Sequence, residues 1–155
     1  MDILLTGSVA YDYLMTFPGL FKEQILPERL GSISLSFLVD GMSKQRGGIA
    51  PNIAYTMALL GENPRVMATV GEDFLDYREW LDSKGVDTTL MEVVPGEFTA
   101  SFFATTDRDS AQIASFYPGA MGHSAKQSLK TLDKKPELVI VSPSAPDAMM
   151  KFPAE

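Results

Sequence analysis

The sequence contains no cysteine and a single histidine, His123. The absence of cysteine excludes disulfides, thiolate metal sites and cysteine nucleophiles, and one histidine is too few for a multi-histidine metal site. Basic residues are also scarce, because 13 Lys and Arg stand against 20 Asp and Glu, which gives a net charge of −7. A surface that binds nucleic acid or an anionic membrane needs basic side chains, so we expect neither partner.

Long hydrophobic runs are absent as well. The first residues have no basic start and too short an apolar run for a signal peptide, and no stretch approaches the roughly 20 apolar residues of a membrane span. With 155 residues, the chain is long enough for one compact domain with its own core. We therefore expect a globular protein of the cytoplasm.

Three short, continuous apolar runs predict the buried strands of a parallel sheet, which is typical of an α/β fold. They occupy residues 3–6, 65–70 and 138–141. Three further segments alternate polar and apolar residues and predict a sheet with one open face. These are residues 32–39, 99–106 and 111–117, the last two joined as a hairpin by a polar turn at 107–110. The sequence thus predicts an α/β body that carries a separate small β-sheet.

Helices are predicted between these strands. They span residues 51–60 and 73–84, a short segment around 125–132, and a start at Asp147. In the second helix, Phe74, Tyr77 and Leu81 are expected on the inner side. Residues 14–30 contain two prolines and are expected to be irregular.

Polar residues near the predicted strand ends are candidates for ligand binding, because ligands of open α/β sheets lie beyond the carboxyl ends of the strands. Asp12 follows the first strand, and its carboxylate could accept hydrogen bonds from two neighbouring hydroxyls; it could equally be a solvated or helix-starting residue. Asn52 could bind the same polyol or serve only as a helix cap. Gly47 and Gly48 let backbone approach a ligand closely, or form only a turn.

The hairpin carries two phenylalanines, Phe102 and Phe116, which we expect opposite each other. Two aromatic rings on one open face could stack on a planar base, each contact contributing about 1–3 kcal/mol, although cross-strand packing is the commoner arrangement. Phe103 and Tyr117 point to the other face and are expected in the core. The sequence suggests no acidic partner for His123, and Asp107 and Asp109 are expected in a solvated turn.

A longer pattern combines several of these residues. Residues 47–54 read Gly-Gly-Ile-Ala-Pro-Asn-Ile-Ala and are followed by Gly61 and Gly71 at set spacings. This stretch resembles the first signature of the PfkB (ribokinase-like) kinases at every specified position. Residues 35–40, 76–81 and 111–121 are most similar to the bacterial adenosine kinases of that family. The resemblance runs through essentially the whole chain and corresponds to the N-terminal half of such an enzyme.

The resemblance implies a partial Rossmann-like ribokinase fold with a lid formed by residues of about 13–46 and 97–118. Asp12, Asn52 and the backbone of Gly47 and Gly48 would hold a ribose. Ser8 and Ser36 would line the pocket, and Phe102 and Phe116 would stack on adenine. The reaction would transfer the γ-phosphoryl group of ATP, with Mg²⁺, to the 5′-hydroxyl of adenosine. The lid sheet would pair two subunits into a homodimer, and Phe37 would reach the neighbouring subunit's site.

One part of the family pattern is missing from residues 1–155. The catalytic base of these kinases lies in a second signature, a Gly-Ala-Gly-Asp-like loop, and no such loop occurs here. We therefore expect no catalytic base, no metal ligand and no complete ATP site in this chain, and no turnover by the chain alone. Two alternatives stay open: a PfkB sugar kinase, such as a ribokinase or fructokinase, and a non-catalytic binding or dimerisation module.

Overall fold

The computed structural model describes residues 1–155, which form two compact units. The first, here called the α/β unit, comprises residues 1–11, 46–101 and 117–155. The second, the β unit, comprises residues 12–45 and 102–116. The chain therefore passes from one unit to the other four times, and each unit is built from segments that are distant in sequence.

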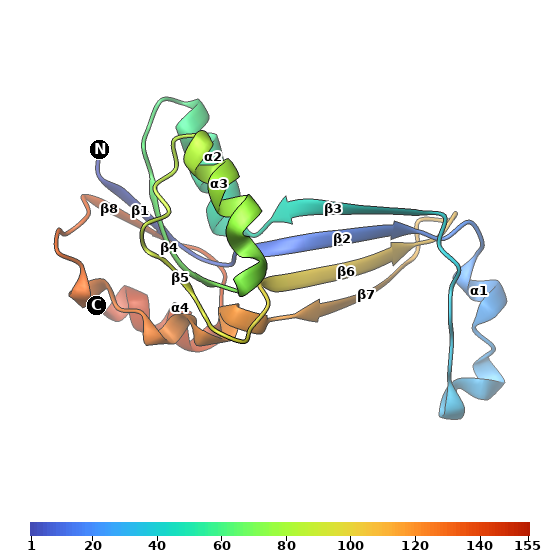
Figure 1. Ribbon diagram of the computed structural model, residues 1–155. Coiled ribbons are helices and arrows are strands. Elements are labelled where there is room, and N and C mark those ends of the chain that lie inside the picture. The colour runs from blue at the N-terminus through green and yellow to red at the C-terminus, as the bar shows by residue number, and fades with distance from the viewer. The chain divides into compact units, whose positions relative to one another are not determined.

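Four parallel strands form the sheet of the α/β unit, in the order β5-β4-β1-β8 (Figure 1). Their bounds are Ile3–Thr6 for β1, Arg65–Val70 for β4, Met91–Val93 for β5 and Leu138–Val141 for β8. Leu5 of β1 lies opposite Val66 on one side and Ile140 on the other. All four residues of β1 are buried, as a strand covered on both faces requires.

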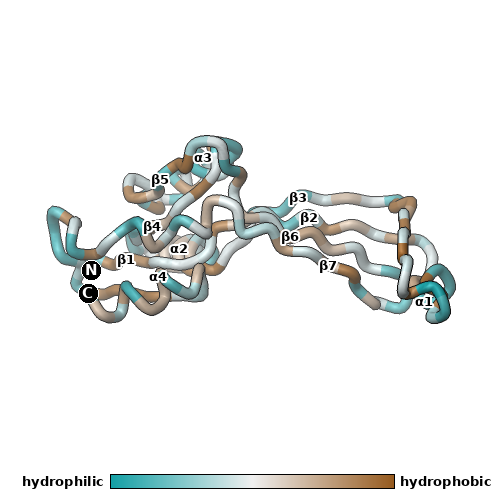
Figure 2. Tube along the Cα trace, turned by 90° about the horizontal axis from the view of Figure 1, so that it is seen from below, coloured by the Kyte–Doolittle hydropathy of each residue, from teal (hydrophilic) through white to brown (hydrophobic).

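Helices cover both faces of this sheet (Figure 1). One face carries α2 (Ile49–Leu59) and α3 (Leu75–Ser83), with the 3₁₀-helix η2 (Glu72–Phe74) before α3. The other face carries α4 (Pro146–Lys151) and three 3₁₀-helices, η3 (Gly119–Lys126), η4 (Leu129–Thr131) and η5 (Phe152–Ala154). A core cluster on this second face joins the sheet to α4 and contains Leu4, Met67, Ala145, Ala148 and Phe152. Figure 2, coloured by hydropathy, shows β1 largely in brown, as expected for a central strand.

A second four-stranded sheet, in the order β3-β2-β6-β7, lies mostly in the β unit, and one end of each strand belongs to the α/β unit. These strands span Ala10–Thr16 (β2), Gly41–Gly47 (β3), Ala100–Thr106 (β6) and Gln112–Tyr117 (β7). The arrows in Figure 1 show β2 and β6 running in one direction and β3 and β7 in the other, so the sheet is mixed. Helix α1 (Phe21–Gln24) and the 3₁₀-helix η1 (Pro27–Ser32) follow β2. The predicted α/β fold with a small separate sheet is confirmed, whereas the action of this sheet as a lid stays a prediction.

The turn between β6 and β7 is organised by a buried carboxylate. Asp107 accepts hydrogen bonds of 2.9 Å from the backbone N–H groups of Phe21, Asp109 and Ala111. These hydrogen bonds hold the pKa of Asp107 below its ordinary range, and the bond from Phe21 has the largest effect. The expectation that Asp107 is solvated was therefore wrong, since it ties helix α1 to the hairpin.

Several predicted elements agree with the structure. The strands at 3–6, 65–70 and 138–141 are present with those bounds, and the hairpin strands differ by one residue at their starts. Helix 51–60 is α2, and the inner side of α3 is confirmed because Phe74, Tyr77 and Leu81 are buried.

The predicted strand at 32–39 was wrong. Ser32 ends a 3₁₀-helix, residues 33–39 have no regular structure, and Ile33, Leu35 and Leu38 are exposed despite their alternating pattern. The strand that enters the sheet is β3, where five consecutive residues are exposed, so no apolar alternation marks it. Strand β2 was also missed, and the helix expected around 125–132 is replaced by η3 and η4.

Candidate functional site

The junction between β1 and α2 brings three of the predicted residues together. Ser8 accepts a hydrogen bond at its side-chain oxygen from the Ile49 N–H, at 3.2 Å, and at its carbonyl from the Ala50 N–H, at 3.3 Å. Gly47 and Gly48 lie immediately before these amides. The structure therefore forms a loop at the start of α2, next to the carboxyl end of β1, where ligands of α/β sheets bind.

Gly48 has a backbone conformation that a side chain would not tolerate. Its φ is 91° and its ψ is 149°, a region used almost only by glycine. A Cβ built there would lie 2.5 Å from the Ser8 carbonyl oxygen and 2.7 Å from the Val9 Cα. A glycine is therefore needed at this position because the backbone of residues 8–10 passes close to it, whether or not a ligand is bound.

Asn52 lies on the first turn of α2, and its side chain is exposed. The N-cap of α2 is Gly48, without a side-chain hydrogen bond, so the alternative that Asn52 caps the helix was wrong. Its carbonyl accepts a hydrogen bond from the Thr56 hydroxyl at 2.9 Å, while its side-chain amide makes none. Asn52 also lines a shallow apolar groove along α2 with Ile49, Ile53, Thr56, Met57 and Leu60.

Asp12 and Ser36 belong to the β unit. The Asp12 side chain is half-buried on β2 and its carboxylate has no hydrogen-bond or ion-pair partner. Burial raises the pKa of Asp12 above its ordinary value. Ser36 is exposed in the irregular segment after η1, and its neighbour Phe37 packs against Phe17 and Phe21 of its own chain, with ring centroids 5.1 and 4.9 Å apart.

The phenylalanines of the hairpin lie on two neighbouring strands of the β unit. The Asp107 N–H donates to the Ala111 carbonyl at 2.9 Å at the turn that joins β6 to β7, the neighbouring strands that carry Phe102 and Phe116. Phe102 is half-buried and Phe116 is exposed, and neither ring packs against another aromatic ring. That the two rings lie opposite each other, and that they stack on a base, both stay predictions.

Three expectations about nearby residues were wrong. Phe103 and Tyr117 are exposed rather than in the core, and the Phe103 ring stacks on Tyr13 with centroids 4.8 Å apart. His123 does have an acidic partner, because its Nε2 lies 3.3 Å from a carboxylate oxygen of Glu97. The Tyr117 hydroxyl donates to the other oxygen of Glu97 at 2.8 Å, and this hydrogen bond is the main cause that lowers the pKa of Glu97.

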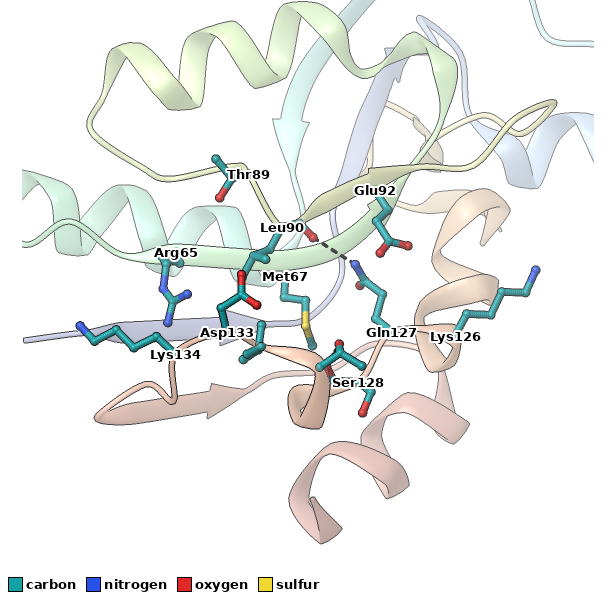
Figure 3. A pocket seen from close by; sticks show the side chains of 12 residues that line it. Arg65, Met67, Thr89, Leu90, Glu92, Lys126, Gln127, Ser128, Asp133 and Lys134 are labelled. Carbon is teal, nitrogen blue, oxygen red and sulfur yellow. Dashed lines mark hydrogen bonds between the residues drawn. The ribbon is translucent and has the colours of Figure 1, made fainter.

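Another cavity of the α/β unit lies away from these residues. It has a volume of about 550 Å³ and is bounded by the start of β4, the start of β5 and the η3–η4 segment (Figure 3). Its lining includes Arg65, Met67, Glu92, Gln127 and Lys134, and Gln127 donates a hydrogen bond to the Leu90 carbonyl at 3.0 Å. No predicted site residue lines this cavity, and it opens at the amino ends of the strands. Its position is therefore opposite to the end where acceptors of this fold class bind.

The donor groups of the described residues do not form a set of ligands for Mg²⁺. No group of three or more His, Asp or Glu side chains is placed to hold a metal ion. The sequence also lacks the glycine-rich second loop that would surround a phosphate. No step of a reaction can therefore be assigned to a cofactor held by these residues.

No helix has the length and apolar character needed to cross a membrane.

Comparison with known proteins identifies relatives along nearly the whole chain. A nucleoside kinase of Methanothermobacter thermautotrophicus is 35% identical over 121 residues, which are 77% of this chain and 36% of that protein. The ligand-free structure of the Burkholderia thailandensis nucleoside kinase is 40% identical, with a TM-score of 0.83 over 99% of this chain and 50% of that one. The same enzyme in complex with inosine is similar with a TM-score of 0.79.

These relatives are longer than the chain described here. The chain spans about half the length of the solved structures and less than half of the curated nucleoside kinases that it matches. The nucleoside kinase of Methanocaldococcus jannaschii, at 24% identity and a TM-score of 0.80, supports the fold alone. The model of the pfkB family of carbohydrate kinases matches residues 6–151, and the chain therefore belongs to the PfkB family.

Proposed function

We propose that this chain carries the acceptor-binding part of a nucleoside kinase, with a purine nucleoside, adenosine foremost, as acceptor. The observation that carries the proposal is the similarity of this chain, over 99% of its length, to an enzyme solved in complex with inosine. In the complete enzyme, the γ-phosphoryl group of ATP is transferred to the 5′-hydroxyl of the nucleoside. Within residues 1–155 we assign no side chain to the ATP site, to Mg²⁺ or to the catalytic base.

The roles of the polar residues follow from what the fold leaves unpaired. Asp12 accepts hydrogen bonds from the ribose hydroxyls, because its carboxylate has no partner within the protein. Asn52, whose amide is also unpaired, binds the same sugar, and the Gly47–Gly48 backbone closes against it. Ser8 shapes this loop by holding the Ile49 and Ala50 amides, and Ser36 lines the rim.

The acceptor base stacks on Phe102 and Phe116. A ring that stacks on a base contributes about 1–3 kcal/mol, and both rings are free of other aromatic contacts. A sugar without a base would gain nothing from this pair. This difference separates a nucleoside kinase from a PfkB sugar kinase.

The experiment is a calorimetric binding panel with the 155-residue chain and adenosine, inosine, ribose and fructose. We expect adenosine or inosine to bind more tightly than either sugar. The Asp12→Ala variant should lose about 3 kcal/mol of binding, roughly a hundredfold in affinity, since hydrogen bonds to a charged group are at stake. Asp133→Ala, which removes an exposed aspartate that lines the remote cavity, is the matched control. Equal affinity for ribose and adenosine, or wild-type affinity of Asp12→Ala, would show that the proposal is wrong.

The β unit also offers a surface for a second copy of the chain. All six residues of β7 are exposed, and this strand lies at the edge of the sheet. Ile113, Phe116 and Tyr117 make the edge apolar, and unpaired edges of this kind favour association. A homodimer through this sheet should appear in sedimentation equilibrium, and Ile113→Lys should shift it to monomer. A wild-type chain that stays monomeric at high concentration contradicts the dimer.

A further inference from the structure

The four points where the chain passes between the units are each next to a side-chain anchor in the α/β unit. The passages follow Tyr11 and Ser101 and precede Arg46 and Tyr117. Two of them adjoin the proposed acceptor site, because Asp12 directly follows Tyr11, and Gly47 directly follows Arg46. The contacts that hold Tyr11, Arg46 and Gly47 in place therefore affect the positions of the groups that we propose to bind the sugar.

One carboxylate binds both of these strand ends. The Tyr11 hydroxyl donates to Asp76 Oδ1 at 2.6 Å and contacts the Asp73 carbonyl at 3.3 Å. The other oxygen of Asp76 forms an ion pair with Arg46, with Nη2 and Oδ2 3.6 Å apart. Asp76 lies in the first turn of α3, so that helix connects β2 with β3 through a single side chain.

The next residue of α3 binds the glycine loop directly. Tyr77 is 1% exposed, and its hydroxyl donates to the Gly47 carbonyl at 3.0 Å. Its ring is held by Tyr11, Phe74 and Trp80, with centroids 5.2 to 5.9 Å away. The Arg46 guanidinium lies 5.9 Å from the same ring, a distance at which a cation is attracted by an aromatic face. The direction of the Tyr77 hydroxyl is thus fixed by packing on several sides.

The glycine loop is therefore held from two directions. Ser8 binds the Ile49 and Ala50 amides that follow Gly48, and Tyr77 binds the carbonyl that precedes it. A loop that presents its backbone to a ligand must keep its peptide groups in one orientation to bind well. Without Tyr77, the peptide between Gly47 and Gly48 would be restrained on one side only.

We propose that Tyr77 and Asp76 are positioning residues of the acceptor site: Tyr77 fixes the Gly47–Gly48 peptide, and Asp76 fixes the strand ends at Tyr11 and Arg46. The consequence for nucleoside binding rests on the proposed function, but the restraint on the loop does not. Neither side chain needs to touch the acceptor, because each acts through the backbone it holds.

The first test is Tyr77→Phe, which removes only the hydroxyl, with backbone hydrogen exchange measured by NMR. A buried hydrogen bond of this type contributes about 1 kcal/mol, so the amides of Gly48, Ile49 and Ala50 should exchange several-fold to about tenfold faster. Tyr55→Phe is the matched control, because its ring packs on Trp80 but its hydroxyl makes no hydrogen bond. Unchanged exchange at these three amides in Tyr77→Phe would overturn the proposal.

The second test is Asp76→Asn, compared with Glu79→Gln, an exposed carboxylate on the same helix without a partner. The amides of Tyr11 and Arg46 should exchange faster in Asp76→Asn and not in Glu79→Gln. This variant also keeps the proposal testable if Tyr77→Phe does not give a cooperatively folded chain, and equal exchange in both carboxylate variants would count against it.

Nucleoside binding gives the readout that a purely structural role would not move. By calorimetry, Tyr77→Phe should weaken adenosine binding about tenfold, while the loss of about 1 kcal/mol lowers its melting temperature by only about 2–4 °C relative to Tyr55→Phe. Faster exchange at Gly48 to Ala50 with unchanged adenosine affinity would refute the positioning role. If the wild-type chain binds no nucleoside, the proposed function fails, and hydrogen exchange still decides whether Tyr77 restrains the loop.

Discussion

Replacing Gly48 by alanine should destabilise the chain more than replacing a glycine that has open space around its Cβ position. The new Cβ would lie 2.5 to 2.8 Å from three backbone atoms of the segment 8–10, and none of these atoms belongs to a flexible side chain. The backbone at Gly48 would also have to keep a φ of 91°, which L-residues rarely adopt. Both effects act on the same residue and add to each other.

The size of the effect can be estimated from these two contributions. A residue forced into a glycine-only region costs about 1–3 kcal/mol, and forcing extra atoms into close-packed structure costs about 1–3 kcal/mol more. The sum is about 2–6 kcal/mol. For a chain of this length, each kcal/mol lowers the melting temperature by about 2–4 °C, so a fall of roughly 4–24 °C is expected.

Two further glycines separate the contributions in the same assay. Gly61 has a φ of 90° but open space around its Cβ position, so Gly61→Ala should show the conformational cost alone. Gly122 has open space and no positive φ, so Gly122→Ala should be nearly neutral. Thermal unfolding followed by circular dichroism should therefore rank the losses as Gly48 above Gly61 above Gly122. A Gly48→Ala variant that melts with Gly122→Ala would refute the reasoning.

Three other outcomes are expected. The lowered pKa of Asp107 means that its stabilising contribution is present above its ordinary value of 3.8 and is lost as the pH falls through the lowered pKa. Asp107→Asn should therefore flatten the acid dependence of the unfolding free energy in urea titrations, and an unchanged slope contradicts this. Because burial raises the pKa of Asp12, adenosine binding should weaken on acidification at a higher pH than for an ordinary aspartate, and calorimetry should find this dependence absent in Asp12→Asn. Phe102→Ala should weaken adenosine binding by about 1–3 kcal/mol and leave ribose unchanged, with the exposed Phe98→Ala as control; equal effects on both ligands would favour a sugar kinase.

The buried parallel strands could be predicted from sequence because burial on both faces leaves an unmistakable run of apolar residues. Residues 3–6 and 65–70 show this pattern, and both lie inside the sheet of the α/β unit. The run at 138–141 has the same composition although it forms an edge strand with half-exposed side chains. Composition thus identified the strand but carried no information about its place in the sheet.

The sheet of the β unit was harder to predict, because its strands are held by backbone pairing more than by burial. β3 is polar and exposed along most of its length, so nothing in its side chains shows that it pairs with β2. The segment 33–39 alternates as a half-buried strand would, yet its apolar residues stay exposed. Local pattern therefore pointed to the wrong one of two neighbouring segments.

The residues that support the glycine loop could not be found from sequence alone. Tyr77 occupies an inner position of an amphipathic helix, where an aromatic ring is expected for packing. Its hydrogen bond joins residues 30 positions apart, and only the fold brings them together. Asp76 resembles any exposed carboxylate on a helix, although it binds Tyr11 across 65 positions.

The predicted site residues divide into those that the fold already uses and those whose side chains it leaves unpaired. Residue 48 must be glycine because a Cβ there would clash with the Ser8 carbonyl, and the Ser8 side chain accepts a hydrogen bond from the Ile49 amide. Both residues therefore have a structural role without any acceptor. Asp12 and Asn52 have no such role, since the fold leaves the side-chain polar atoms of both without a partner. A half-buried carboxylate without a hydrogen bond lowers stability, and burial alone accounts for its raised pKa. We therefore propose that the acceptor supplies the missing partners of these two side chains, and the specificity of the proposed site should be tested first at Asp12 and Asn52.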